Sequence, residues 1–279
     1  MRLTVAPPDW AQVDIAVPRS TALPGVSMAG FRHRAPAFVD IAMVAHPSVT
    51  LIVDLSDDEG IIHGAPGRSE RGSAFIGLAP GEVHAAGTLG ECLQVRLSPV
   101  VAARAFGPAA ELTGTVASFA DVWGRGAGRF EDRLRAAPSW DERFAVVVEV
   151  IGQRLDRSVD AEVAHSWQRM LASRGRLRID GADGIAGEVG WSRKRLWARF
   201  RSQLGISPKR AAQLVRFDHA AHLLAAGRAV AAVAAESGYV DQSHLHREVT
   251  AFAGATPAAV AAAPWLAIDD IAWPVTPRR

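Results

Sequence analysis

An internal duplication in the second half constrains this 279-residue chain most strongly. The segment "IAGEVGWSRKRLWARF", which starts at residue 185, shares its pattern with "VAAESGYVDQSHLHREV", which starts at residue 233. Matched positions agree in character, first at an offset of 48 residues and then at 49: Ile185 with Val233, Ala186 with Ala234, Gly190 with Gly238, Trp191 with Tyr239, Leu196 with Leu245, Phe200 with Val249, Gly205 with Gly254 and Pro208 with Pro257. Such agreement predicts two copies of one supersecondary unit.

Each copy has the pattern of a helix-turn-helix. A short helix is expected to end at Gly190 or Gly238, because glycine readily takes the left-handed conformation that follows many helices. An aromatic residue then fills the corner. Ser192 or Asp241 is expected to cap the second helix. The sequence therefore predicts two small helical units of the same design.

A long helix is expected to join the two units. Ser207 caps it, Pro208 is its first residue, and it runs to about Ala226, with Gly227 at its C-terminal end. Its apolar stripe includes Ala212, Val215, Ala220 and Leu223. This stripe is expected to tie both units into one body.

Charge divides the chain unevenly. Residues 1–165 hold 15 Arg and 20 acidic residues, a net charge of −5. Residues 166–260 hold 12 Arg and 2 Lys against 7 acidic residues, a net charge of +7, and residues 261–279 sum to zero. The stretch from Trp191 to Gly205 has five basic residues and no acidic one. This imbalance indicates that the second half meets a polyanion, most plausibly nucleic acid.

The motifs "VGWSRKRLWARFRSQLGISP" and "SGYVDQSHLHREVTAFAGATP" resemble the AraC/XylS family of bacterial transcription regulators over residues 170–260. Val249 stands where the family usually has Phe. The resemblance implies a sequence-specific, cytoplasmic regulator that binds double-stranded DNA. It also implies a small-molecule effector, a homodimer and contact with RNA polymerase. Activation and repression are equally compatible with it.

The first unit places its buried edge at Leu196, Phe200 and Leu204, so Lys194, Trp197, Ala198 and Arg201 lie roughly opposite. The expected DNA-binding residues of this unit are Ser192, Arg193, Lys194, Arg195, Trp197, Ala198, Arg199 and Arg201. Three arginines flank the face at positions suited to phosphates: Arg193, Arg195 and Arg199. The family resemblance places Lys194, Trp197 and Ala198 toward bases. Two interpretations of Trp197 stay open: contact with a thymine methyl, or folding back over the protein.

The second unit is expected to present Gln242, Ser243, His246, Arg247 and Thr250 to DNA. Gln242 suits a bidentate pair with adenine, and Arg247 suits guanine or phosphate. In the family this unit often contacts the backbone as much as the bases. Gly184 and Gly187 are expected inside the first helix of the other unit, each at a cost of about 1 kcal/mol relative to Ala. That unit is therefore expected to be loose before it meets DNA.

The first half reads as strands followed by helices. Alternating apolar residues in 49–55 and 93–97 indicate strands, and Gly/Pro breaks over residues 20–98 predict a small barrel or sandwich. After Pro99 the pattern becomes helical, with an amphipathic segment from Phe144 to Leu155 that either buries its stripe in the monomer or forms a dimer. The predicted fold is α+β with two domains: residues 1–165, β-rich with trailing helices, and residues 166–260, all-α. The family resemblance implies that the first domain is cupin-like and serves as an effector sensor or dimerisation module. Residues 261–279 form a Pro/Trp-containing tail of unknown role.

Catalysis has little support in the first half. Its histidines show neither an HxH pair nor an HxxxE spacing, and no GxSxG, Walker or GxGxxG motif is present. We therefore expect no enzyme activity, metal or cofactor. An effector pocket is guessed near Phe31, His46, His63 and His84. Two alternatives stay open: a cupin-type metalloenzyme fused to a DNA-binding domain, and a regulator without a small-molecule effector.

Two further sequence features indicate the cellular compartment of the protein. The single cysteine, Cys92, excludes an internal disulfide and fits a reducing compartment. No apolar run reaches the length of a membrane span, and the N-terminal residues lack a signal-peptide core. The sequence therefore predicts a cytoplasmic protein that does not act in a membrane.

Overall fold

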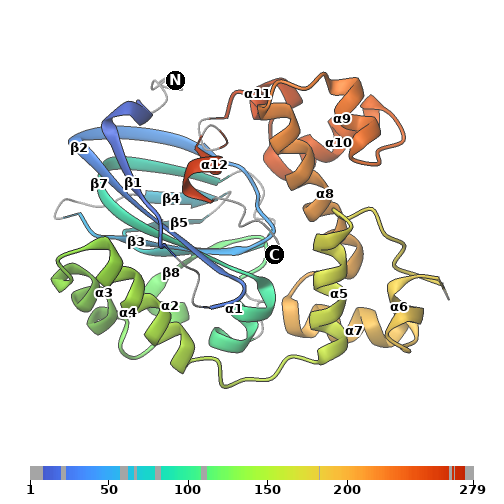
Figure 1. Ribbon diagram of the computed structural model, residues 1–279, viewed down its shortest axis with the longest axis horizontal. Helices are drawn as coiled ribbons and strands as arrows, with labels where there is room; N and C mark the ends of the chain where they lie inside the picture. Colours follow the sequence, from blue (N-terminus) through green and yellow to red (C-terminus); the bar gives the residue numbers. More distant parts are fainter. Residues whose placement is uncertain are drawn as a thin grey trace.

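The computed structural model of the chain describes residues 9–19, 23–56, 62–65, 68–78, 83–107, 112–181, 183–263, 266 and 268–273. Strands and a group of helices form one half, and a column of helices stands beside them (Figure 1). This arrangement confirms the expected two-domain α+β architecture.

The sheet is antiparallel and follows the order β1-β2-β7-β3-β6-β8, with β4 paired to both β7 and β5. Its strands are β1 (Val13–Ala16), β2 (Val26–Met43), β3 (Val49–Asp54), β4 (Ile62–Ala65), β5 (Arg68–Arg71), β6 (Ala74–Ile76), β7 (Val83–Leu97) and β8 (Val116–Ser118). β1 and β8 lie outside the expected range of 20–98. They are too short to show a period, and pairing with β2 and β6 defines them.

The strands predicted from alternating apolar residues are present, and the alternation sends their side chains into two cores. Leu51 and Val53 of β3 and Leu93 of β7 face the larger core, which continues into the helices. Ile52 and Cys92 face the opposite way, into a smaller core. Long strands β2 and β7 pair over nearly their whole length and form the frame on which both cores rest.

Helices cover one side of this sheet (Figure 1). They are α1 (Pro99–Phe106), α2 (Phe119–Trp123), α3 (Ala127–Ala136) and α4 (Trp140–Gln153), and a short 3-10 turn, η1 (Trp10–Gln12), precedes β1. Ser139 caps α4 by accepting a hydrogen bond from the amide of Glu142. Phe144, Val147 and Ile151 are buried within the chain. The amphipathic stripe is therefore used inside the monomer.

The second half contains α5 (Ala161–Ala172), α6 (Ile185–Glu188), α7 (Arg193–Leu204), α8 (Pro208–Ala225), α9 (Val230–Glu236), α10 (Gln242–Ala253), α11 (Pro257–Ala261) and α12 (Asp269–Ala272). Both predicted corners are present, since Gly190 and Gly238 have φ values of 68° and 76° and Trp191 and Tyr239 are buried. The long joining helix is α8, with Ser207 as its cap.

The expectation for Gly184 was wrong. This residue is the N-cap of α6 in extended backbone, so only Gly187 lies inside the helix. A Cβ at Gly184 would lie 2.6 Å from the carbonyl oxygen of Asp180, so close approach of the backbone explains glycine there. The domain division expected after residue 165 falls inside α5, which packs on α7 and α8.

The two halves touch. α1 lies against α7, and the apolar core runs from the sheet into the helices around α8. After α11 the chain returns to the first half, where α12 lies against β1 (Figure 1). Among the described residues, no helix has the length and apolar character needed to cross a membrane.

Candidate nucleic-acid interface

α7 is held at both ends by the residues that the sequence predicted. Ser192 accepts a hydrogen bond from the amide of Arg195, and Gly205 ends the helix in the left-handed conformation. Leu196, Phe200 and Leu204 are completely buried and fix α7 to its neighbours. The opposite side of α7 therefore faces solvent.

The predicted base-reading residues of α7 differ in their surroundings. Lys194, Ala198 and Arg201 are exposed. Trp197 is half-buried, and its indole Nε1 donates a hydrogen bond to Oδ1 of Asp180 at 3.3 Å. Without DNA, Trp197 thus lies back against the protein, the second of its two interpretations.

Acidic residues from outside the helix hold two of its arginines. Nε of Arg193 lies 3.2 Å from Oδ1 of Asp180. Arg199 makes two hydrogen bonds to Asp160, of 2.7 and 2.9 Å, and these bonds lower the pKa of the Asp160 carboxyl. No sequence pattern predicts either acid, because both lie far away along the chain. Each pair places a carboxylate beside an arginine that the sequence predicted to contact phosphate.

α10 repeats the design of α7. Asp241 caps it by accepting a hydrogen bond from the amide of His244 at 2.7 Å. Leu245, Val249 and Phe252 are completely buried, so the unusual valine still fills the core position. The five residues expected to meet DNA are all exposed: Gln242, Ser243, His246, Arg247 and Thr250.

A buried carboxylate fastens α10 to α8. Glu248 has 4% of its side chain exposed, and its oxygens accept hydrogen bonds of 2.6 and 3.0 Å from Arg216. Gln213 donates a further bond of 3.2 Å to the same carboxylate. A bidentate pair of this kind restricts orientation as well as distance. The pitch of α10 relative to α8 is therefore fixed by these three side chains.

α7 and α10 both contribute side chains to the wall of one hollow. Its volume is about 510 Å³, and its wall includes Arg193 and Trp197 of α7, Lys209 and Gln213 of α8, and His244 of α10. The hollow thus adjoins the N-terminal halves of both α7 and α10. Sequence reasoning missed Lys209, which is exposed at this hollow, because it belongs to the joining helix.

A family model described as "Helix-turn-helix domain" matches residues 185–263. The match spans both corners, both solvent-facing helices and α8. Residues 185–263 are an AraC-type helix-turn-helix domain. This AraC-type domain is the DNA-binding part of a transcription regulator.

Solved structures similar to this chain include ToxT from Vibrio cholerae, with 12% identity, a TM-score of 0.47, and coverage of 95% of this chain and 100% of that one. Another is wild-type ToxT from Vibrio cholerae with an unsaturated fatty acid bound, with 12% identity, a TM-score of 0.45, and coverage of 85% and 94%. The AraC-like transcriptional activator CuxR has 15% identity, a TM-score of 0.32, and coverage of 69% and 81%. A search of curated proteins found no match.

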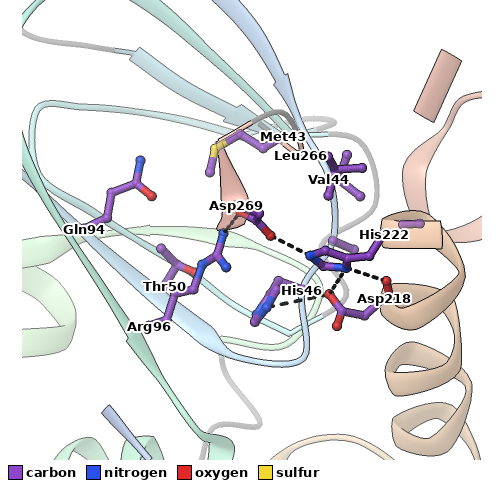
Figure 2. Close-up of a pocket in the computed structure, with 12 residues that line it drawn as sticks. Met43, Val44, His46, Thr50, Gln94, Arg96, Asp218, His222, Leu266 and Asp269 are labelled. Carbon is purple, nitrogen blue, oxygen red and sulfur yellow. Dashed lines mark hydrogen bonds and ion pairs between the residues drawn. The ribbon is translucent and has the colours of Figure 1, made fainter. Parts of the chain in front are cut away.

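On the side of α8 away from the hollow, the AraC-type domain meets the first half through charged groups (Figure 2). Asp269 of α12 lies 3.2 Å from Arg96 of β7 and 2.7 Å from Nε2 of His222 on α8. Nε2 of His46 lies 3.6 Å from Oδ1 of Asp218 on α8. These contacts link the sheet, the tail and the AraC-type domain.

Burial and pairing act in opposite directions on these groups. Burial would lower the pKa of His222, but the hydrogen bond to Asp269 and the charge of Asp218 outweigh it and raise the pKa to about 9. Burial would raise the pKa of Asp269, but His222 and Arg96 lower it to about 2. Burial raises the pKa of Asp218 to about 6. At neutral pH, His222 and Asp269 are therefore a charged pair.

A cavity of about 320 Å³ adjoins these groups, lined by His46, Arg96, His222 and Trp273 among others. Of the four residues guessed for the effector pocket, the structure places His46 here. Phe31 is buried in the smaller core, and His84 lies 3.5 Å from Asp40 on β2. The side chain of His63 lies outside the described part of the chain. Within that described part, no cluster of three or more His, Cys, Asp or Glu residues could hold a metal ion.

Proposed function

We propose that this chain reads a specific DNA sequence through α7 and α10 together. The observation that carries this proposal is the common hollow, onto which both helices open while α8 and the Arg216–Glu248 pair fix their relative position. Two helices held this way suit successive major-groove segments on one face of DNA, about 34 Å apart. A bend in the DNA would let the helices approach more closely.

Roles within α7 follow from exposure and pairing. Lys194 and Ala198 are exposed without an acidic neighbour in the described residues, and they read base edges. Arg195 lies with its guanidinium 4.3 Å from the ring centre of Trp191 and contacts phosphate. Arg193 and Arg199 join it once their acidic partners are exchanged for phosphates. Trp197 contributes an apolar surface if it leaves Asp180.

The exposed residues of α10 supply affinity through contacts to the DNA backbone: Gln242, Ser243, His246, Arg247 and Thr250. Gln242 is also suited to adenine. The DNA-bound protein acts on transcription in the cytoplasm, with RNA polymerase as a partner. A second copy of the chain is a further partner, but its surface is not the stripe of α4, which is already buried.

The first half acts as the regulatory domain. Its α1 touches α7, and the interdomain cavity of about 320 Å³ falls at the lower end of the size range of small-molecule sites. An effector bound there would change DNA affinity by favouring one interdomain arrangement over another. His46, which belongs to the first half and lines this cavity, is the member of the guessed set that supports an effector site.

Selection of bound duplexes from a random library by the full-length protein tests the proposal. We expect an enriched motif with two conserved patches about one helical turn apart. Binding that depends on salt but enriches no motif would contradict sequence reading and leave only a phosphate-gripping surface.

A further inference from the structure

The C-terminal tail continues past the AraC-type domain and returns to the sheet (Figure 1). Ile268 and Ala272 are buried in the smaller core, beside residues of β2 and β7. The guanidinium of Arg96 lies 3.9 Å from the ring centre of Trp273. The tail is thus anchored on the first half by apolar and cation–π contacts, although it follows the DNA-binding domain in sequence.

Asp269 lies at the centre of this anchor (Figure 2). Its side chain is 93% buried, and its two oxygens are divided between two partners: Oδ1 accepts from Arg96 at 3.2 Å, and Oδ2 lies 2.7 Å from Nε2 of His222. Arg96 belongs to the sheet and His222 to α8. One carboxylate therefore joins both domains.

A buried carboxylate is stable only when it is paired, so Asp269, Arg96 and His222 depend on one another. If α8 moved away, Asp269 would lose one cationic partner while it stayed buried. His46 and Asp218 form a second, longer contact of 3.6 Å across the same boundary. The interdomain arrangement is therefore favoured by the tail in its docked position.

We propose that Asp269 is a positioning residue that clasps the DNA-binding domain to the first half, and that the clasped form binds DNA more weakly than the released form. This inference rests on the proposed function and names its regulation. The clasp contacts the side of α8 opposite the proposed DNA-facing side. His222 and Gln213 are nine residues apart on α8, which places them on opposite sides of the helix at about 100° per residue.

Two observations give the direction of the effect. The clasp holds a domain of net charge −5 beside one of net charge +7, which weakens the attraction of the second domain for a polyanion. It also keeps α1 against α7, the helix that carries the predicted DNA-contacting face of the first unit. Release of the clasp would expose the basic domain to DNA.

The test uses full-length Asp269→Asn and His222→Gln with the duplex selected by the wild-type protein. These substitutions change the net charge in opposite directions, so charge alone would move DNA affinity in opposite directions. We expect both variants to bind the duplex roughly fivefold more tightly, at the lower end of typical coupling between sites. The double variant is expected to gain little more, because both changes break the same pair.

Asp132→Asn is the matched control, since Asp132 is an exposed acid on α3 of the first half. It should leave affinity close to that of the wild-type protein. Trypsin cleavage after Arg157, an exposed residue between α4 and α5, reports the interdomain contact directly. It should be faster in both clasp variants, and circular dichroism should show unchanged helix content.

Folded clasp variants with unchanged or weaker affinity would overturn the inference, and so would unchanged cleavage after Arg157. If a variant fails to fold, Trp273→Ala provides the same test, because it loosens the anchor without changing charge. Failure of the proposed function would look different, because the wild-type protein would then select no motif.

Discussion

The basic side chains of α7 differ mainly in whether an acid holds them. Lys194 is exposed and free among the described residues, whereas Arg199 is bound to Asp160 through two hydrogen bonds. The caps at Ser192 and Asp241 could be predicted from sequence, because a cap acts within its own helix turn. The pairing of Arg199 could not, because Asp160 is brought to it only by packing of α5 on α7.

Substitutions at neighbouring residues of α7 should separate base reading from phosphate contact. Lys194→Ala is expected to change the preference at one base position, because the lysine donates to a base edge. Arg195→Ala should weaken binding to all sequences about equally and lower the salt slope by about one. Selection and salt titration measure both effects. The assigned face is wrong if Arg195→Ala changes base preference while Lys194→Ala leaves it unchanged.

Asp160→Asn should free Arg199 for phosphate. The Asp160 side chain makes no capping hydrogen bond to α5, so α5 should be preserved. We expect tighter DNA binding and a salt slope larger by about one. In an Arg199→Gln background the same substitution should have little effect. A slope that does not change in Asp160→Asn would show that Arg199 never reaches DNA.

Among the elements, the duplicated ones could be predicted best. Gly190, Gly238 and the apolar spacing of α7 and α10 placed both corners and both solvent-facing helices correctly, and Ser207 and Pro208 placed the start of α8. β1, β8 and α12 could not be predicted. Each is three or four residues long, and each is formed by contact with a distant part of the chain. The same holds for the candidate site. Its exposed face could be predicted from the helical periodicity, whereas the places of Lys209 and Glu248 depend on tertiary contacts.

Leu245→Ala tests the placement of the second unit. The side chain is completely buried in α10, so its removal should lower the free energy of unfolding by roughly 2–5 kcal/mol. Val240→Ala is the control at the same corner, because Val240 is 87% exposed and its loss should change stability by less than about 0.5 kcal/mol. Chemical denaturation measures both. Equal stabilities for the two variants would contradict the packing of α10.

For the whole molecule, the important feature is the charged boundary between its halves. His222 faces Asp269 of the tail, Asp218 and His219 of α8, Arg96 of β7 and His46 of the first half. The groups that meet across the boundary lie far apart along the chain. The sequence therefore indicated the two domains but not their contact. The opposite net charges of the halves, −5 and +7, are consistent with this charged boundary, although in the sequence they indicated only a polyanion partner.

The pH dependence of stability should reveal this boundary. The pKa of His222 is raised from 6.5 to about 9, so its contribution is full below pH 6.5 and is lost as pH rises through about 9. Asp269, with its pKa lowered to about 2, stays ionised throughout this range. The melting temperature of the wild-type protein should therefore fall between pH 7 and pH 10. The fall should be smaller in His222→Gln, and equal falls would rule out this role of His222.

Above all, we infer that α7 and α10 read one face of DNA together. Hydroxyl-radical footprinting of the full-length protein on its selected duplex tests this directly. We predict two protected patches on one face of the duplex, about one helical turn apart, as expected for helices in successive major-groove segments. A single patch, or even protection along the whole duplex, would contradict the paired reading by α7 and α10.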